Sequence, residues 1–113
     1  MHEISMVEDV LRIILGVATE NNIRCIDNVN LVIGEYMQVK PDLVVFAFDA
    51  AKEGTIASNA KLRLEIEPVE ICCESCGNMF VLRKNKYECP ICSSSQLEII
   101  KGKYMYIKSI EGT

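Results

Sequence analysis

Four cysteines in two closely spaced pairs are the residues of this chain whose types and spacing most clearly indicate chemistry. Cys73 and Cys76 form one Cys-x-x-Cys pair, Cys89 and Cys92 form another, and residues 77–88 separate the two pairs. Each pair fits a tight turn that aims both sulfurs at one ion, and two such turns place four thiolates at the corners of a tetrahedron. Zinc binds in this geometry. The sequence therefore predicts a structural zinc site that leaves no coordination position open for a substrate.

Other uses of the cysteines agree less well with the sequence. A thioredoxin-like redox site needs one pair rather than two, and no βαβ pattern surrounds either pair. Iron also accepts four thiolates, but the rest of the chain shows no electron-transfer design. Cys72 directly precedes Cys73 and forms a Cys-x-x-x-Cys alternative with Cys76, so which sulfur takes the first zinc position stays open. Cys25 is expected to be a small buried or half-buried residue.

The amino terminus carries a second set of candidate metal ligands. The sequence contains one histidine, His2, and Glu3 follows it. The amine of Met1, the imidazole of His2 and the amide or carboxylate of Glu3 could close five- or six-membered chelate rings on one ion. Nitrogen-rich, square-planar surroundings suit Ni(II) or Cu(II). Alternatively, Met1 and His2 simply precede a helix whose positive end is stabilised by Glu3.

Two helices and three strands are expected to position these groups. Apolar residues at helical spacing predict a first helix over residues 4–21. Its apolar face is expected to contain Ile4, Val7, Leu11, Ile14, Leu15 and Ala18. Pro41 and Asp42 suit the first turn of a second helix, and Gly54 suits the stop after it. The apolar face of this second helix is expected to contain Leu43, Val44, Ala47, Phe48 and Ala51.

Alternating apolar residues predict strands over residues 28–36 and 61–67, and β-rich residues predict a closing strand over residues 104–110. The expected core positions of the first two strands are Val29, Leu31, Ile33, Leu62, Leu64 and Ile66. This order of elements predicts an α+β fold, with a small mixed domain of two helices packed on a three-stranded sheet. A zinc-ribbon-like four-cysteine module is expected as an insertion before the last strand. The expected boundaries are 1–68 plus 103–113 for the α+β domain and 69–102 for the module.

The composition argues against several classes of function. The formal net charge is −4, which suits nucleic acid poorly, although Arg83, Lys84 and Lys86 form a small basic cluster. No apolar run is long enough to span a membrane. Residues 4–18 lack the basic start and the small-residue cleavage site of a signal peptide, so a soluble cytoplasmic protein is expected. With one histidine and no nucleophile motif, the chain is not expected to be an enzyme.

Taken together, these motifs resemble the HypA family of nickel-delivery accessory proteins for the maturation of nickel–iron hydrogenase. The resemblance extends over essentially the whole chain. It rests on Met1-His2-Glu3 opening into a helix, Gly34-Glu35 after a strand, Gly54-Thr55, the two cysteine pairs, and the final strand after Gly102.

The resemblance implies a metallochaperone that carries Ni(II) as cargo and holds a separate structural Zn(II). His2 would be the main nickel ligand, with the amine of Met1 and the amide or side chain of Glu3 beside it. Because His2 must be neutral to bind metal, nickel binding is expected to weaken below about pH 6.5. The zinc ligands would be Cys73, Cys76, Cys89 and Cys92.

The implied partners are a GTPase usually called HypB and the hydrogenase large-subunit precursor, and some family members also serve urease. Neither nucleic acid nor a membrane is an expected partner. The chain is expected to be a monomer or a weak homodimer, since an exposed sheet edge could support pairing. The alternative function is a zinc-ribbon adaptor in metalloenzyme assembly that has no nickel site of its own.

Overall fold

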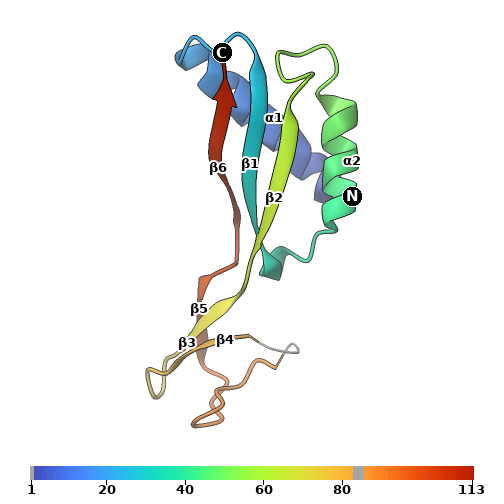
Figure 1. Cartoon of the computed structure of the whole chain (residues 1–113). Coiled ribbons are helices and arrows are strands. Elements are labelled where there is room, and N and C mark those ends of the chain that lie inside the picture. Colours follow the sequence, from blue (N-terminus) through green and yellow to red (C-terminus); the bar gives the residue numbers. More distant parts are fainter. Residues whose placement is uncertain (1, 83–85) are drawn as a thin grey trace. The chain divides into compact units, whose positions relative to one another are not determined.

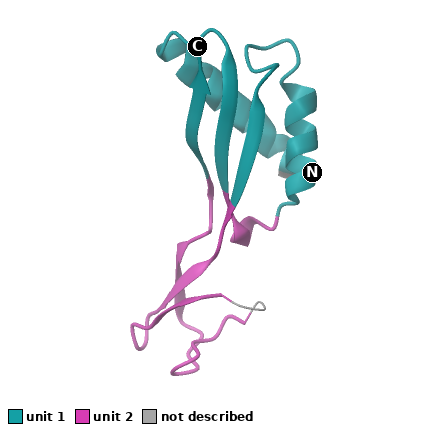
Figure 2. Ribbon diagram, in the orientation of Figure 1, with its two compact units in different colours: residues 1–32, 39–65, 106–113 teal, residues 33–38, 66–105 magenta. Residues whose placement is uncertain are grey.

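The chain divides into two compact units. The computed structural model describes residues 2–82 and 86–113. Unit 1 comprises residues 1–32, 39–65 and 106–113, and unit 2 comprises residues 33–38 and 66–105 (Figure 2). The backbone therefore passes between the two units four times.

Unit 1 contains a three-stranded sheet and two helices. Its elements are α1 (His2–Glu20), β1 (Ile26–Gly34), α2 (Pro41–Ala51), β2 (Lys61–Glu67) and β6 (Met105–Gly112). The strand order is β2-β1-β6, and Figure 1 shows α1 running across one face of this sheet. The ends of β1 and β2 and the start of β6 belong to unit 2. Among the described residues, no helix is both long and apolar enough to cross a membrane.

The helix α1 buries one continuous apolar stripe, as expected from its helical spacing. The buried residues of this stripe are Met6, Val7, Val10, Leu11, Ile14 and Ala18. The stripe is centred on Val7, Val10 and Ile14, so Ile4 lies at its margin and is 52% exposed. The assignment of Ile4 to the buried face was therefore wrong, and Met6 and Val10 take its place.

The remaining core of unit 1 comes from α2 and the sheet. Val44 and Phe48 of α2 are fully buried, whereas Leu43 is 46% exposed. In β1 the three expected positions are buried, as is the intervening Val32, so this middle strand is covered on both faces. In β2, by contrast, Ile66 is 43% exposed, and its assignment to the core was wrong. As an edge strand, β2 has a neighbour on one side only.

Unit 2 contains a second three-stranded sheet, which the sequence did not predict in detail. Its elements are the 3-10 helix η1 (Glu35–Met37) and the strands β3 (Glu70–Cys73), β4 (Met79–Val81) and β5 (Leu97–Lys101). The middle strand, β3, pairs antiparallel with both β4 and β5. The two helices, the two small sheets and the clustered cysteines confirm the predicted α+β fold class.

Three separate segments of unit 2 meet around two glycines. The N–H of Gly34 donates to the carbonyl of Tyr104 at 3.0 Å, and the N–H of Tyr36 donates to the carbonyl of Gly102 at 2.9 Å. The N–H of Gly102 donates in turn to Oε1 of Glu67 at 3.0 Å. These bonds hold residues 34–36, the end of β2 and residues 102–104 in one junction.

Only glycine suits either position in this junction. Gly102 has a φ of +82°, which favours glycine, and a Cβ there would collide with the carbonyl oxygen of Pro68. A Cβ on Gly34 would collide with the carbonyl of Gly102. The close approach of neighbouring backbone segments therefore explains why both positions are occupied by glycine.

Candidate metal centres

The first cysteine pair lies in a tight turn that follows β3. The N–H of Cys73 donates to the carbonyl of Asn78, and the N–H of Gly77 donates back to the carbonyl of Cys73, both at 2.8 Å. Gly77 has a φ of +76°, so a glycine relieves the backbone strain at this position. This turn brings the sulfurs of Cys73 and Cys76 into the same four-cysteine group.

The second pair lies in a turn closed by the same two hydrogen bonds. The N–H of Cys89 donates to the carbonyl of Ser94 at 3.0 Å, and the N–H of Ser93 donates back to the carbonyl of Cys89 at 2.9 Å. Here Ser93 occupies the position equivalent to Gly77, with a φ of +61°. A serine at this position gave no signal in the sequence that the two turns are equivalent.

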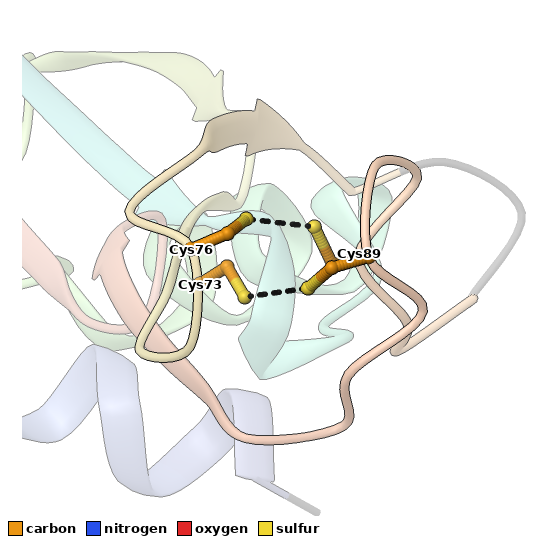
Figure 3. A group of neighbouring side chains, drawn as sticks. Cys73, Cys76 and Cys89 are labelled. Atoms are coloured by element: carbon orange, nitrogen blue, oxygen red, sulfur yellow. Dashed lines mark hydrogen bonds between the residues drawn. The ribbon is translucent and has the colours of Figure 1, made fainter.

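The four sulfurs face one another. All four lie within 4.8 Å of each other, with Sγ–Sγ distances of 3.5 Å between Cys73 and Cys92 and 3.6 Å between Cys76 and Cys89 (Figure 3). A tetrahedral zinc ion with Zn–S bonds of about 2.3 Å requires sulfur separations of about 3.8 Å. The donor set and its spacing therefore fit a four-coordinate ion. The structure brings together the four predicted cysteines, while their role as zinc ligands stays a prediction.

Backbone hydrogen bonds lower the pKa of the buried cysteine in each turn. Cys73 and Cys89 are each 1% exposed, whereas Cys76 and Cys92 are exposed. The backbone N–H of Cys76 lowers the pKa of Cys73, and the backbone N–H of Cys92 lowers the pKa of Cys89 to about 6. In both cases a hydrogen bond stabilises the charged form more than burial destabilises it.

The pKa of the other cysteine in each turn is raised. The N–H of Asn78 lowers the pKa of Cys76, but partial loss of hydration at its sulfur and the neighbouring thiols outweigh this effect and raise that pKa to about 12. The N–H of Ser94 likewise lowers the pKa of Cys92, but the thiol of Cys73 and partial loss of hydration raise it. Four thiolates so close together need a compensating cation, and a divalent ion would supply that charge.

Direct contacts between the turns hold them side by side. The hydroxyl oxygens of Ser75 and Ser94 lie 2.8 Å apart, and the N–H of Glu74 donates to the carbonyl of Gln96 at 3.0 Å. These contacts join the two cysteine turns directly.

The other two cysteines lie outside the four-sulfur group. Cys72 is half-buried, and its Sγ lies 3.8 Å from the carbonyl oxygen of Cys73. Because successive residues of a strand point to opposite faces, Cys72 and Cys73 face in different directions on β3. Cys25 is half-buried, as expected, with its Sγ 3.8 Å from Oδ1 of Asp27.

At the amino terminus, the structure describes only part of the predicted nickel-binding set. Met1 and the side chain of His2 lie outside the described residues, although the backbone of His2 begins α1. Glu3 is 8% exposed, and its Oε2 accepts a hydrogen bond from the N–H of Lys40 at 3.1 Å. That N–H, together with the N–H of Glu3 itself, helps to lower the pKa of Glu3 to about 2. Sequence reasoning missed this bond, since nothing in the local pattern connects Glu3 with Lys40.

The basic cluster between the cysteine pairs is also only partly described. Arg83 and Lys84 lie outside the described residues, and Lys86 is exposed.

Comparison with known proteins identifies the family. Residues 1–112 match the family described as "Hydrogenase/urease nickel incorporation, metallochaperone, hypA". The chain belongs to the HypA family. Hydrogenase maturation factor HypA from Aquifex aeolicus is 40% identical over 111 residues, which cover 98% of this chain and 96% of the relative. HypA from Moorella thermoacetica is 38% identical over 112 residues, which cover 99% of both chains.

Solved HypA structures share the fold. The solution structure of the nickel metallochaperone HypA from Helicobacter pylori matches with a TM-score of 0.74 at 28% identity, covering 97% of this chain and 96% of that one. A second HypA solution structure matches with a TM-score of 0.76 at 29% identity, covering 100% and 97%. HypA proteins are metallochaperones rather than enzymes, so family membership agrees with the expectation that this chain is not an enzyme.

Proposed function

We propose that this HypA-family chain binds Ni(II) at Met1, His2 and Glu3 and delivers it during the maturation of nickel–iron hydrogenase. In this proposal a structural Zn(II) occupies the separate four-cysteine site. Nickel binding would belong to residues 1–68 plus 103–113, and zinc binding to residues 69–102. The family description, which names nickel incorporation and matches from residue 1, supports this function.

The start of α1 is the single observation that best supports a nickel site at the amino terminus. The first four N–H groups of an α-helix have no hydrogen-bond partner within the helix. Because α1 begins at His2, the amide nitrogens of His2 and Glu3 lie in the first turn, where they do not donate to helix carbonyls. Once these two amides have released their protons to solvent, nickel could bind their nitrogens together with the amine of Met1 and the imidazole, without breaking a hydrogen bond to a helix carbonyl. Such a nitrogen-rich set suits Ni(II).

The closed cysteine cluster supports separate sites for a structural ion and for the nickel cargo. Across residues 3–82 and 86–113, the four cysteines form the only group of three or more Cys, His, Asp or Glu side chains arranged to hold one ion. A four-sulfur site has no open position, and zinc held in this way is structural. Cargo that must be released is better held at a terminal chelate, which protons can compete for.

The proposed partners follow from the delivery step. A carrier needs a protein that receives nickel and one that governs transfer, and we assign these roles to the hydrogenase large-subunit precursor and a HypB-like GTPase. The family description also names urease, so a urease precursor is a second possible recipient.

Nickel titration of the zinc-loaded protein with an untagged amino terminus tests this proposal. We expect one nickel ion per chain, and we expect His2→Ala to weaken binding by at least about tenfold because the only imidazole is lost. A tag upstream of Met1 serves as a second variant, since it removes the free amine. Equal nickel binding by all three proteins would overturn the terminal site. Absence of nickel binding by the untagged protein would favour the zinc-ribbon adaptor without a nickel site.

A further inference from the structure

One pair of serines joins the two cysteine turns through its side chains. The hydroxyl oxygens of Ser75, in the first turn, and Ser94, in the second, lie 2.8 Å apart. The Oγ of Ser94 also accepts a hydrogen bond from the N–H of Gln96 at 3.1 Å. A hydroxyl can accept and donate at the same time. The hydroxyl of Ser94 can therefore donate to Ser75 while it accepts from Gln96.

A backbone hydrogen bond beside this pair also connects the two turns. The N–H of Glu74 donates to the carbonyl of Gln96 at 3.0 Å. Because the Oγ of Ser94 holds the N–H of Gln96, the Ser94 hydroxyl supports both connections between the turns. Removing this hydroxyl should therefore loosen more contacts than removing the hydroxyl of Ser75.

Each serine also lies beside one sulfur of the four-cysteine site. Ser75 follows Cys73 by two residues, and the N–H of Cys76 and then the N–H of Ser75 lower the pKa of Cys73. Ser94 follows Cys92 by two residues, and its N–H lowers the pKa of Cys92, although other groups raise that pKa overall. The sulfurs of Cys73 and Cys92 lie 3.5 Å apart. Each serine therefore donates its N–H to one of these sulfurs and pairs its hydroxyl with the other serine.

Loss of an ion from this site is opposed by whatever holds the two turns together. Each turn supplies two of the four sulfurs. A chelator can remove an ion held by all four only after thiolates detach, and separation of the turns detaches two at once. We propose that the hydroxyls of Ser75 and Ser94 form a clamp that slows loss of metal from the four-cysteine site. Both serines are positioning residues, since they act through the turns and not as ligands.

Slow loss of zinc has a consequence for a chain that also carries nickel. Selectivity among divalent ions depends on geometry and metal availability as well as on affinity, so an empty four-thiolate site would be open to the cargo. A clamp that slows zinc loss keeps this site filled. The inference rests on the proposed structural zinc, and the amino-terminal nickel site plays no part in its test.

Transfer of zinc from the loaded protein to the coloured chelator pyridylazoresorcinol measures the clamp. Ser75→Ala and Ser94→Ala each remove one hydroxyl. Ser95→Ala is the matched control, because Ser95 is an exposed serine next to Ser94. We expect Ser75→Ala to release zinc about three- to tenfold faster than the parent, as loss of one hydrogen bond implies. Ser94→Ala should release it at least as fast, and Ser95→Ala at about the parental rate.

A variant that lacks both hydroxyls tests whether the two serines act together. If they bind each other, the double variant should release zinc no faster than Ser94→Ala. Rate increases that multiply would show that the serines act separately and would overturn the clamp. Parental rates in both single variants would overturn it as well.

Two further measurements separate a clamp from a change of ligands or a loss of fold. The absorption spectrum of the Co(II)-loaded protein should be the same in all variants, since four thiolates remain. The amide of Glu74, which donates across the turns, should exchange faster in Ser94→Ala, while the amides of β3 keep their protection.

The contrary outcomes are distinct from one another. An altered Co(II) spectrum would mean that the serines change the ligand set, and loss of protection throughout unit 2 would mean that they only stabilise the fold. Either result contradicts the clamp, as does faster zinc release with unchanged exchange at Glu74. If the parent holds no zinc, the structural zinc site and the clamp are both wrong. If the parent holds zinc but binds no nickel, the proposed carrier function fails and the clamp stands.

Discussion

At the scale of single residues, the adjacent Cys72 and Cys73 take different roles because strand geometry separates them. Cys73 is one of the four converging sulfurs at the end of β3, whereas the Sγ of Cys72 lies 3.8 Å from the carbonyl oxygen of Cys73. In register, Cys72 lies opposite Met79 of β4 and Glu98 of β5. One residue of displacement along a strand is enough to turn a thiol away from the cluster.

We therefore predict different outcomes for two matched serine substitutions. Cys72→Ser should keep about one zinc ion per chain, because Cys72 is not among the converging sulfurs. Cys73→Ser should bind zinc at least about tenfold more weakly, since one of four thiolates is lost. Metal analysis after dialysis against a mild chelator measures both. Loss of zinc from Cys72→Ser would show that Cys72, not Cys73, takes the first position.

At the scale of elements, the glycine junction of unit 2 joins segments that are far apart in the sequence. Three backbone donors from η1, the end of β1 and Gly102 are satisfied there. A side chain at Gly102 would meet backbone atoms, which cannot move aside as a flexible side chain would.

Gly102→Ala should therefore destabilise unit 2 more than Gly77→Ala does. Both positions have positive φ, at +82° and +76°, but a Cβ on Gly77 would meet nothing within 4 Å. Gly77→Ala should cost about 1–2 kcal/mol from backbone strain alone, and Gly102→Ala should cost about 1–3 kcal/mol more because of overpacking. Urea unfolding of the zinc-loaded variants, with zinc content checked, measures the difference. Equal costs would mean that the junction relaxes to admit a methyl group.

The predictability of each element depended on the kind of signal it carries. The strand over residues 61–67 was predicted with its observed bounds, and α2 begins at the predicted Pro41, since regular alternation and a first-turn proline are local signals. The strands β3, β4 and β5 are short, and they flank the cysteine turns. Ile71 and Cys73 are the buried residues in these strands. Their pairing was therefore not visible in the spacing of apolar residues.

In the candidate sites, too, features with a local sequence signal could be predicted and contacts between distant segments could not. The four converging sulfurs could be predicted because both ligand type and spacing lie within one segment of sequence. The contact between Glu3 and Lys40 could not, because it depends on where two helices place their first residues. Likewise, the equivalence of Ser93 to Gly77 appears only in the backbone hydrogen bonds.

At the scale of the whole molecule, the two units differ in what holds them together. Most buried apolar side chains belong to α1, α2 and β1, in unit 1. Apart from Ile33 and two cysteines, the apolar side chains recorded as buried in unit 2 are Val69 and Ile71. So small a core needs a further source of stability, and a bound metal is the usual one.

Removal of zinc with a strong chelator should therefore unfold unit 2 selectively. We expect the amides of β3, β4 and β5 to lose hydrogen-exchange protection, whereas those of α1 and α2 keep it, because the core of unit 1 does not include the cysteines. Restoring zinc should restore protection. Simultaneous loss of protection in both units would show that they unfold as one cooperative body.

The strand order β2-β1-β6 has a consequence for the chain as the ribosome makes it. β1 is made early, but one of its two sheet neighbours, β6, ends at Gly112. Until then β1 keeps one unpaired edge, which is a site for wrong pairing. All four cysteines precede β6, so zinc can order their segment while this edge is still open. Metal supply would then act before the last strand is added.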